Sequence, residues 1–171
     1  MINIMEIKKS NWVTTDHRVS LGVPFAKIDE ERRLVSGYAT LDNIDDQYDV
    51  VLAEASARAF ARARGNIREM HQPIAAGRLV DFKEDEVIDP DTGQVYKGIY
   101  VTAYVSKGAQ DTWEKVLDGT LTGFSIGGSI TESETQWVKD ANANVRFVKD
   151  YSLDELSLVD NPANQKAVRR L

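Results

Sequence analysis

Short runs in which apolar and polar side chains alternate recur along most of the chain. Successive side chains of a β-strand point to opposite faces, so an alternating run predicts a strand with one buried face. Turn-forming residues separate these runs, and the strongest turn signal is Asp89-Pro90-Asp91-Thr92-Gly93. The clearest run sets Ile99, Val101, Ala103 and Val105 between Tyr100, Thr102 and Tyr104. The chain is therefore predicted to be mainly β.

The same patterns place the individual elements. Predicted strands cover 19–27, 33–41, 67–70, 76–82, 87–88, 94–105, 121–131, 145–149 and 153–159. Predicted helices cover 51–64, 109–117 and 163–171, and the first is expected to pack through Ala53, Ala57, Phe60 and Ala61. The segment 132–144 is expected to form a loop or hairpin tip. These elements predict an α+β fold class, mainly β, in which the sheet closes into a barrel with peripheral helices.

Composition limits the organisation of the chain. Its 171 residues suffice for one core and are few for two, so we expect an N-terminal arm at 1–18, one domain at 19–167 and a basic tail at 168–171. A net charge of −6 disfavours a general nucleic-acid binder. No apolar run approaches the roughly 20 residues that cross a bilayer. Cysteine is absent, which excludes disulfides, thiolate nucleophiles and cysteine metal sites.

The stretch Gly123-Phe124-Ser125-Ile126-Gly127 carries the strongest functional signal. Glycines beside the serine let the backbone turn sharply or approach another group, so we expect an exposed hydroxyl. A serine nucleophile also needs a base, and His71 lies upstream between two predicted strands. Asp154 and Glu155 lie downstream in a strand-like run. Serine, histidine and carboxylate are the parts of a hydrolytic triad.

The setting of Ser125 argues against an α/β-hydrolase. In that fold the serine follows a strand and opens a helix, and a histidine comes later in the chain. Here a predicted helix precedes Ser125, a predicted strand continues after it, and no histidine follows. On its own the glycine–serine pattern arises often by chance, and His71 alone is more typical of a hydrogen-bonded strand end.

Four blocks, in order, resemble the prohead proteases of tailed bacteriophages. They are Gly37-Tyr38-Ala39-Thr40-Leu41 with the following Asp45–Val51 segment, His71 with Ala76–Val80, Gly123–Gly128, and Leu153–Asn164, which contains Pro-Ala-Asn. The resemblance covers about residues 20–167. It implies a mainly antiparallel β-barrel ringed by helices, as in herpesvirus assemblins, and marks 19–167 as a prohead serine protease domain.

The resemblance also implies a function. Such enzymes are serine endopeptidases that act inside the immature capsid in the host cytoplasm. They cleave scaffolding protein, or the scaffolding segment of the major capsid protein, and often themselves. The implied partners are therefore the major capsid protein and the scaffolding protein, and assemblin-type enzymes also pair as homodimers. No metal or organic cofactor, nucleic acid or membrane is implied.

The roles carry over residue by residue. Ser125 would be the nucleophile, His71 the general base, and Glu155 the group that orients the imidazole, with Asp154 as the rival third member. Alternation favours Glu155, because Asp154 shares a face with the apolar Leu156 and Leu158, which we expect to point to the core. Backbone N–H groups near Gly127 and Gly128 are candidates for the oxyanion hole, with Arg78 as a charged helper.

Two alternatives to the protease remain. One is a capsid-associated structural protein on the same fold that has lost activity, and the other is an unrelated hydrolase that uses Ser125. The aspartates at 45, 46 and 49 raise the question of a calcium loop, but no glutamate follows at the required spacing. We therefore expect 42–49 to be a solvated acidic loop.

Overall fold

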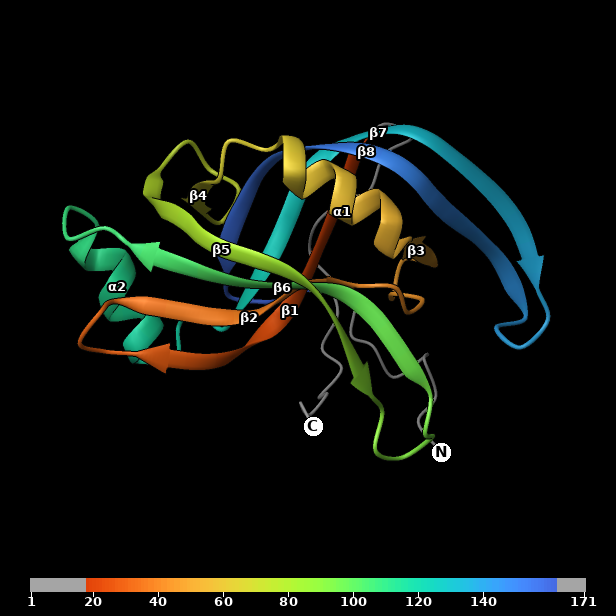
Figure 1. Cartoon of the computed structure of the whole chain (residues 1–171), viewed down its shortest axis with the longest axis horizontal. Helices are drawn as coiled ribbons and strands as arrows, with labels where there is room; N and C mark the ends of the chain where they lie inside the picture. Colours follow the sequence, from red (N-terminus) through yellow and green to blue (C-terminus); the bar gives the residue numbers. More distant parts are fainter. Residues whose placement is uncertain (1–17, 163–171) are drawn as a thin grey trace.

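The computed structural model describes residues 18–162 as one mixed β-sheet with two short helices (Figure 1). The helices are α1 (Ala53–Arg62) and α2 (Gln110–Leu117), and neither of these described helices is long and apolar enough to cross a membrane. The strands are β1 (Arg18–Asp29), β2 (Leu34–Leu41), β3 (Asp49–Val51), β4 (Asn66–Glu69), β5 (Ala75–Ile88), β6 (Val95–Val105), β7 (Gly123–Val138) and β8 (Ala143–Val159).

The strands are hydrogen-bonded in a ring. Their order is β3-β8-β4-β5-β6-β2-β1-β7, and β7 also pairs with β8, which closes the sheet on itself. The prediction of a mainly β fold with peripheral helices is confirmed, including the hairpin of β1 and β2. The sheet is mixed rather than wholly antiparallel, because β3 and β4 both run parallel to β8. Strand β3 pairs with residues 146–148 of β8 and β4 with residues 156–158, and the chain passes through α1 between these two strands.

The ends of β7 and β8 extend beyond the ring as a two-stranded ribbon (Figure 1). The hairpin tip predicted at 132–144 is present but much shorter: β7 continues to Val138, and only four residues separate it from β8. Residues 131–137 are all exposed, so they lack the apolar alternation that reveals a strand. The sequence predicts two separate strands at 76–82 and 87–88, but β5 is one continuous strand. Its central residues are mostly exposed, so they also lack the apolar alternation.

Helix α1 packs through a face that coincides only in part with the predicted one. Its buried residues are Ala55, Ser56, Ala59 and Phe60. Of the predicted residues, Phe60 is buried and Ala57 is partly buried against the core. Alanines occur on both sides of this helix, and their small side chains give little contrast between the two faces. The buried Ser56 is paired with the hydroxyl of Tyr151 on β8, 3.0 Å away. This bond satisfies both polar groups and fixes α1 against the sheet.

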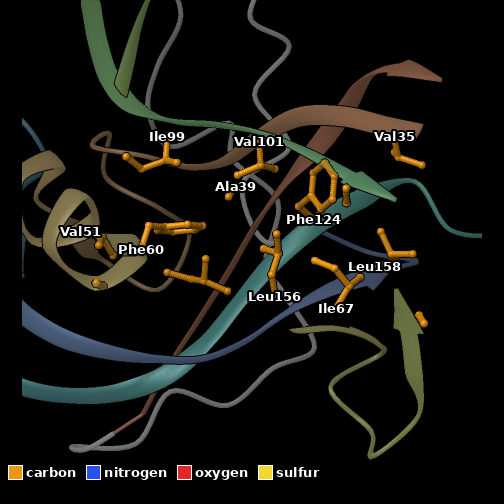
Figure 2. Packing of buried hydrophobic residues seen from close by; sticks show 14 of the residues in the cluster. Val35, Ala39, Val51, Phe60, Ile67, Ile99, Val101, Phe124, Leu156 and Leu158 are labelled. Carbon is orange, nitrogen blue, oxygen red and sulfur yellow. The ribbon is translucent and has the colours of Figure 1, made fainter. Parts of the chain in front are cut away.

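The main core fills the space enclosed by the sheet (Figure 2). It combines Val35 and Ala39 of β2, Ile99 and Val101 of β6, and Phe124 of β7 with Phe60 of α1 and Ile67 of β4. Strand β8 contributes Leu156 and Leu158, which are almost fully buried. Burial of each large apolar side chain contributes about 1.5–3 kcal/mol. Because side chains alternate along β8, Glu155 and Ser157 lie on its other face.

The acidic loop is not solvated as predicted. Asp45 and Asp49 are 4% and 3% exposed. Asp49 accepts two hydrogen bonds from the guanidinium of Arg146, each 2.9 Å long, and thereby joins β3 to β8. Asp45 accepts the backbone N–H groups of Gln47 and Asp49, so its side chain builds the loop. The predicted arm, apart from Arg18, the predicted helix at 163–171 and the basic tail at 168–171 lie outside the described residues.

Asp45 predicts how the stability of the protein changes with pH. Burial raises the pKa of its carboxyl from 3.8 to about 7, because the charged form is desolvated there. The folded state therefore holds a proton that the unfolded chain has already lost. The free energy of unfolding should fall by on the order of a few kcal/mol as the pH rises from about 4 to about 7. Urea unfolding at about pH 5 and about pH 8 measures most of this change, and Asp45→Asn should remove most of the measured difference.

Asp118→Asn is the matched control for this prediction. Asp118 also accepts a backbone N–H, that of Thr120, but it is exposed, and its bonds to Thr120 lower the pKa of its carboxyl. A lowered pKa contributes stability that is lost only as the pH falls through that pKa, so this variant should keep the wild-type slope between the two pH values. An Asp45→Asn protein with an unchanged slope would contradict the account.

Candidate active site

Ser125 lies near the beginning of strand β7, as its third residue. Strand β7 is flanked by β1 and β8, and Ser125 stands opposite Gly22 on one side and Ser157 on the other. The residue is fully buried, so the expectation of an exposed hydroxyl is wrong. Of the two roles expected for the flanking glycines, the structure shows close approach to neighbouring segments and not a sharp turn. This setting differs from the strand–turn–helix that presents the serine of an α/β-hydrolase.

His71 follows β4 in a strained turn. Met70 and His71 have φ values of 54° and 56°, in the left-handed region that non-glycine residues seldom adopt. The N–H of Met70 donates to the carbonyl of Leu158 on β8, over 2.9 Å. The N–H of His71 donates to the hydroxyl of Ser157, over 3.0 Å. Each strained residue costs on the order of 1–3 kcal/mol, and such strain gathers at functional sites.

The imidazole of His71 lies between Ser125 and Glu155. Its Nε2 is 2.9 Å from the hydroxyl oxygen of Ser125, and its Nδ1 is hydrogen-bonded to Oε1 of Glu155. An ionised carboxylate can only accept, so Nδ1 carries the proton and donates it to Glu155. Nε2 is then the acceptor for the Ser125 O–H. The structure therefore brings together the three side chains that the sequence singled out.

An irregularity in β8 gives the two acidic candidates, Asp154 and Glu155, different surroundings. The pairing with β7 shifts from Gly127↔Glu155 to Gly128↔Leu153, which places Asp154 in a β-bulge. Asp154 is exposed there, whereas Glu155 is 5% exposed and contacts His71. The alternation argument thus put Glu155 on the correct face. Its expectation that Asp154 points to the core fails, because the bulge interrupts the alternation.

Ser157 is a member of the site that sequence reasoning missed. Its hydroxyl donates to Oε2 of Glu155 at 2.9 Å and accepts the backbone N–H of His71. The residue is fully buried. One signal could have found it: Ser157 is two residues from Glu155, so the two side chains share a face of the strand.

The end of β4 is anchored to helix α2. Glu69, two residues before His71, accepts the hydroxyl of Thr112 at 3.0 Å and the ammonium of Lys115 at 3.2 Å. The backbone N–H of Gln72 also returns to the carbonyl of Glu69 and closes the turn around His71. This anchor was also missed, because nothing in the spacing of Glu69, Thr112 and Lys115 indicates that they meet.

Gly127 and Gly128 allow β8 to approach β7 closely. A methyl group at Gly127 would overlap the carboxylate of Glu155 and lie 3.0 Å from Nδ1 of His71. A methyl group at Gly128 would overlap the backbone carbonyl of Ser152. Arg78 is exposed on β5, and its guanidinium carbon lies over the ring of Tyr104, 5.0 Å from the ring centroid. In residues 18–162, no cluster of three or more His, Asp or Glu side chains is placed to hold a metal ion.

A serine, a histidine and a carboxylate linked in this order define the site of the serine-hydrolase class. The model of one protein family, described as "Putative phage serine protease XkdF", matches residues 22–134. The chain therefore belongs to this family of phage serine proteases, one of the prohead protease families. The matched range includes His71 and Ser125 and ends before Glu155. No curated protein and no solved structure shows significant similarity to the chain.

Substitution of Gly127 tests whether close approach of the strands builds the site. The added methyl group of Gly127→Ala would displace the Glu155 carboxylate from His71. We expect a fluorophosphonate probe to label Ser125 on the order of 10²-fold more slowly, because small displacements of catalytic groups have effects of that size. The measurement is the intact mass of the protein over time, followed by peptide mapping.

Gly108→Ala is the control, since its new methyl group would lie 3.5 Å from the nearest side-chain atom, an ordinary contact. It should be labelled at the wild-type rate. If Gly127→Ala were labelled equally fast, the glycine would not be needed for the geometry of the site.

Proposed function

We propose that this chain is a serine endopeptidase that acts through an acyl-enzyme. The observation that carries the proposal is the position of the His71 imidazole, with Nε2 2.9 Å from the Ser125 hydroxyl and Nδ1 bonded to Glu155. A serine hydroxyl is a weak nucleophile until a base accepts its proton. His71 is within reach of that proton, and Glu155 holds the ring in the tautomer that can accept it.

The proposed reaction has two steps. Ser125 Oγ attacks the scissile carbonyl while Nε2 takes the hydroxyl proton, and the imidazolium then gives this proton to the departing amine. The N-terminal part of the substrate remains as an ester on Ser125. Water enters, loses a proton to Nε2, and attacks the ester. The imidazolium then gives this proton to Ser125 Oγ as the ester bond breaks, which releases the acid and restores the serine. Glu155 stabilises the imidazolium in both steps and stays ionised.

Access to Ser125 requires a movement. The residue is fully buried, whereas the side chain of His71 retains 12% exposure. A scissile carbonyl must therefore displace part of the covering chain before it meets Oγ. Substrate binding and assembly of the reactive complex are then coupled, as in enzymes that close around a substrate.

The oxyanion donors are proposed at Gly127 and Gly128. Glycine has no side chain to block a substrate, so the backbone at these two residues can be approached closely. Main-chain N–H groups are common donors to a developing oxyanion. Arg78 is the weaker candidate, because its guanidinium lies over the ring of Tyr104.

The biological role is proposed from the family. A phage serine protease of a prohead protease family would act in the immature capsid, within the host cytoplasm, on scaffolding protein or on a scaffold segment of the major capsid protein. It would also cut its own chain and pair as a homodimer. We further propose that the closed ring of strands is a barrel of the assemblin type. The complete triad favours an active enzyme over a structural capsid protein on this fold, and the strand setting of Ser125 disfavours an unrelated hydrolase.

Cleavage of the cognate capsid and scaffolding proteins tests the proposal. Co-expression with the wild-type chain should yield fragments that mass spectrometry detects. Ser125→Ala and His71→Ala should yield none, because loss of either group removes nucleophilic attack. Glu155→Gln should lower the rate by on the order of 10⁴-fold, since an amide can hold the imidazole in the wrong tautomer.

Asp154→Asn is the matched control for Glu155→Gln, because it makes the same chemical change at the neighbouring exposed carboxylate. It should cleave at the wild-type rate. Equal cleavage by the Ser125 and His71 variants would refute the triad. If no version cleaves while the chain still enters the particle, the structural alternative becomes the better account.

A further inference from the structure

We infer that Ser157 is a positioning residue of the site, whose hydroxyl holds both the carboxylate of Glu155 and the backbone of His71. This inference rests on the proposed function, since it concerns how the same triad is held in its reactive geometry. Ser157 does not touch the reacting hydroxyl in this account. It acts through the two residues that surround it.

One oxygen atom makes both contacts. The hydroxyl of Ser157 is 2.9 Å from Oε2 of Glu155 and 3.0 Å from the backbone nitrogen of His71. The amide N–H can only donate and an ionised carboxylate can only accept, so the hydroxyl accepts from His71 and donates to Glu155. Ser157 is fully buried, and water does not compete for either bond.

The bond to Glu155 fixes the orientation of its carboxylate. Oε1 meets Nδ1 of His71, and Oε2 meets Ser157, so both oxygens are held at once. The last torsion of a glutamate side chain is broad and has no strong preference of its own. With only Oε1 engaged, the carboxylate could turn about that torsion and carry the imidazole with it. The hydroxyl of Ser157 removes this freedom.

The bond to His71 stabilises a strained backbone. Met70 and His71 are consecutive left-handed residues, and such conformations persist only where the surroundings enforce them. Two neighbouring residues of β8 bind the two amides: Leu158 accepts from Met70, and Ser157 accepts from His71. Without the hydroxyl, one of these two tethers is lost, and the base is less firmly placed over Ser125.

The register of the sheet explains why a single residue can do both. Ser157 stands directly opposite Ser125 in the pairing of β8 with β7. Strand β4 pairs with β8 on its other edge and places Arg68 beside Ser157, three residues before His71. Ser157 thus lies between the strand that carries the nucleophile and the strand that leads to the base.

The test uses a fluorophosphonate probe and the Ser157→Ala variant of the full chain. We expect the limiting rate of Ser125 labelling to fall on the order of 10²-fold, because the base is displaced from the nucleophile. The probe concentration that gives half of this limiting rate should stay near the wild-type value, since Ser157 does not contact the probe. Ser152→Ala is the matched control on the exposed part of the same strand and should behave as wild type.

A second readout does not depend on activity. An imidazole N–H that donates to a carboxylate gives a proton resonance far downfield of the backbone amides. This signal of His71 should be present in the wild type and in Ser152→Ala, and it should weaken or vanish in Ser157→Ala. Ser157→Thr retains the hydroxyl and should restore both the signal and the labelling rate. Thermal unfolding of each variant shows whether it remains folded.

Each outcome decides the inference. Wild-type labelling and an unchanged signal in Ser157→Ala would overturn it. If Ser157→Ala does not fold, Ser157→Thr decides: recovery of labelling supports the inference, and a folded threonine variant without the signal overturns it. If the wild type itself is not labelled and cleaves nothing, the proposed function fails. The resonance of His71 then still decides whether Ser157 positions the pair.

Discussion

The pairing of β8 with both β7 and β4 is the constraint on which the site depends. Strand β7 brings Ser125 to one edge of β8, and β4 leads to His71 at the other. Glu155 and Ser157 lie on β8 between them. Two of the three proposed catalytic groups therefore lie on neighbouring strands, and the third, His71, lies in a turn after β4 that is hydrogen-bonded to β8. A rigid sheet suits a reaction that tolerates little displacement of its groups.

Strand β8 contributes residues both to the core and to the proposed active site. Leu156 and Leu158 pack in the core, and Glu155 and Ser157 face the site. The register that buries the two leucines therefore also presents these two polar residues to the site. A slip of one residue would turn the leucines towards the site and the carboxylate of Glu155 towards the apolar core. The left-handed turn at Met70 and His71 is held by bonds to the same strand. The cohesion of the core thereby offsets the strain at Met70 and His71.

Much of this was predictable where side-chain patterns were strong. Alternation predicted most strands and put Glu155 on the face of β8 that meets His71, and the family resemblance named His71 and Ser125. The predictions failed where the sequence shows no contrast between a buried and an exposed face, or where a bulge interrupts the alternation. The polar ribbon of β7 and β8 has no buried face, α1 has alanines on both sides, and the bulge at Asp154 interrupts the alternation. Ser157, Glu69 and the burial of Ser125 depend on contacts between distant segments, which spacing along the chain does not reveal.

The central claim is that Ser125 carries the acyl group during cleavage. Acid quenching of the wild-type chain while it cleaves its capsid or scaffold substrate, followed by peptide mapping, would locate that group. The account predicts the N-terminal product of the substrate esterified to Ser125. An acyl group on any other residue would contradict it. So would continued cleavage at the wild-type rate by a chain whose Ser125 has been blocked chemically beforehand.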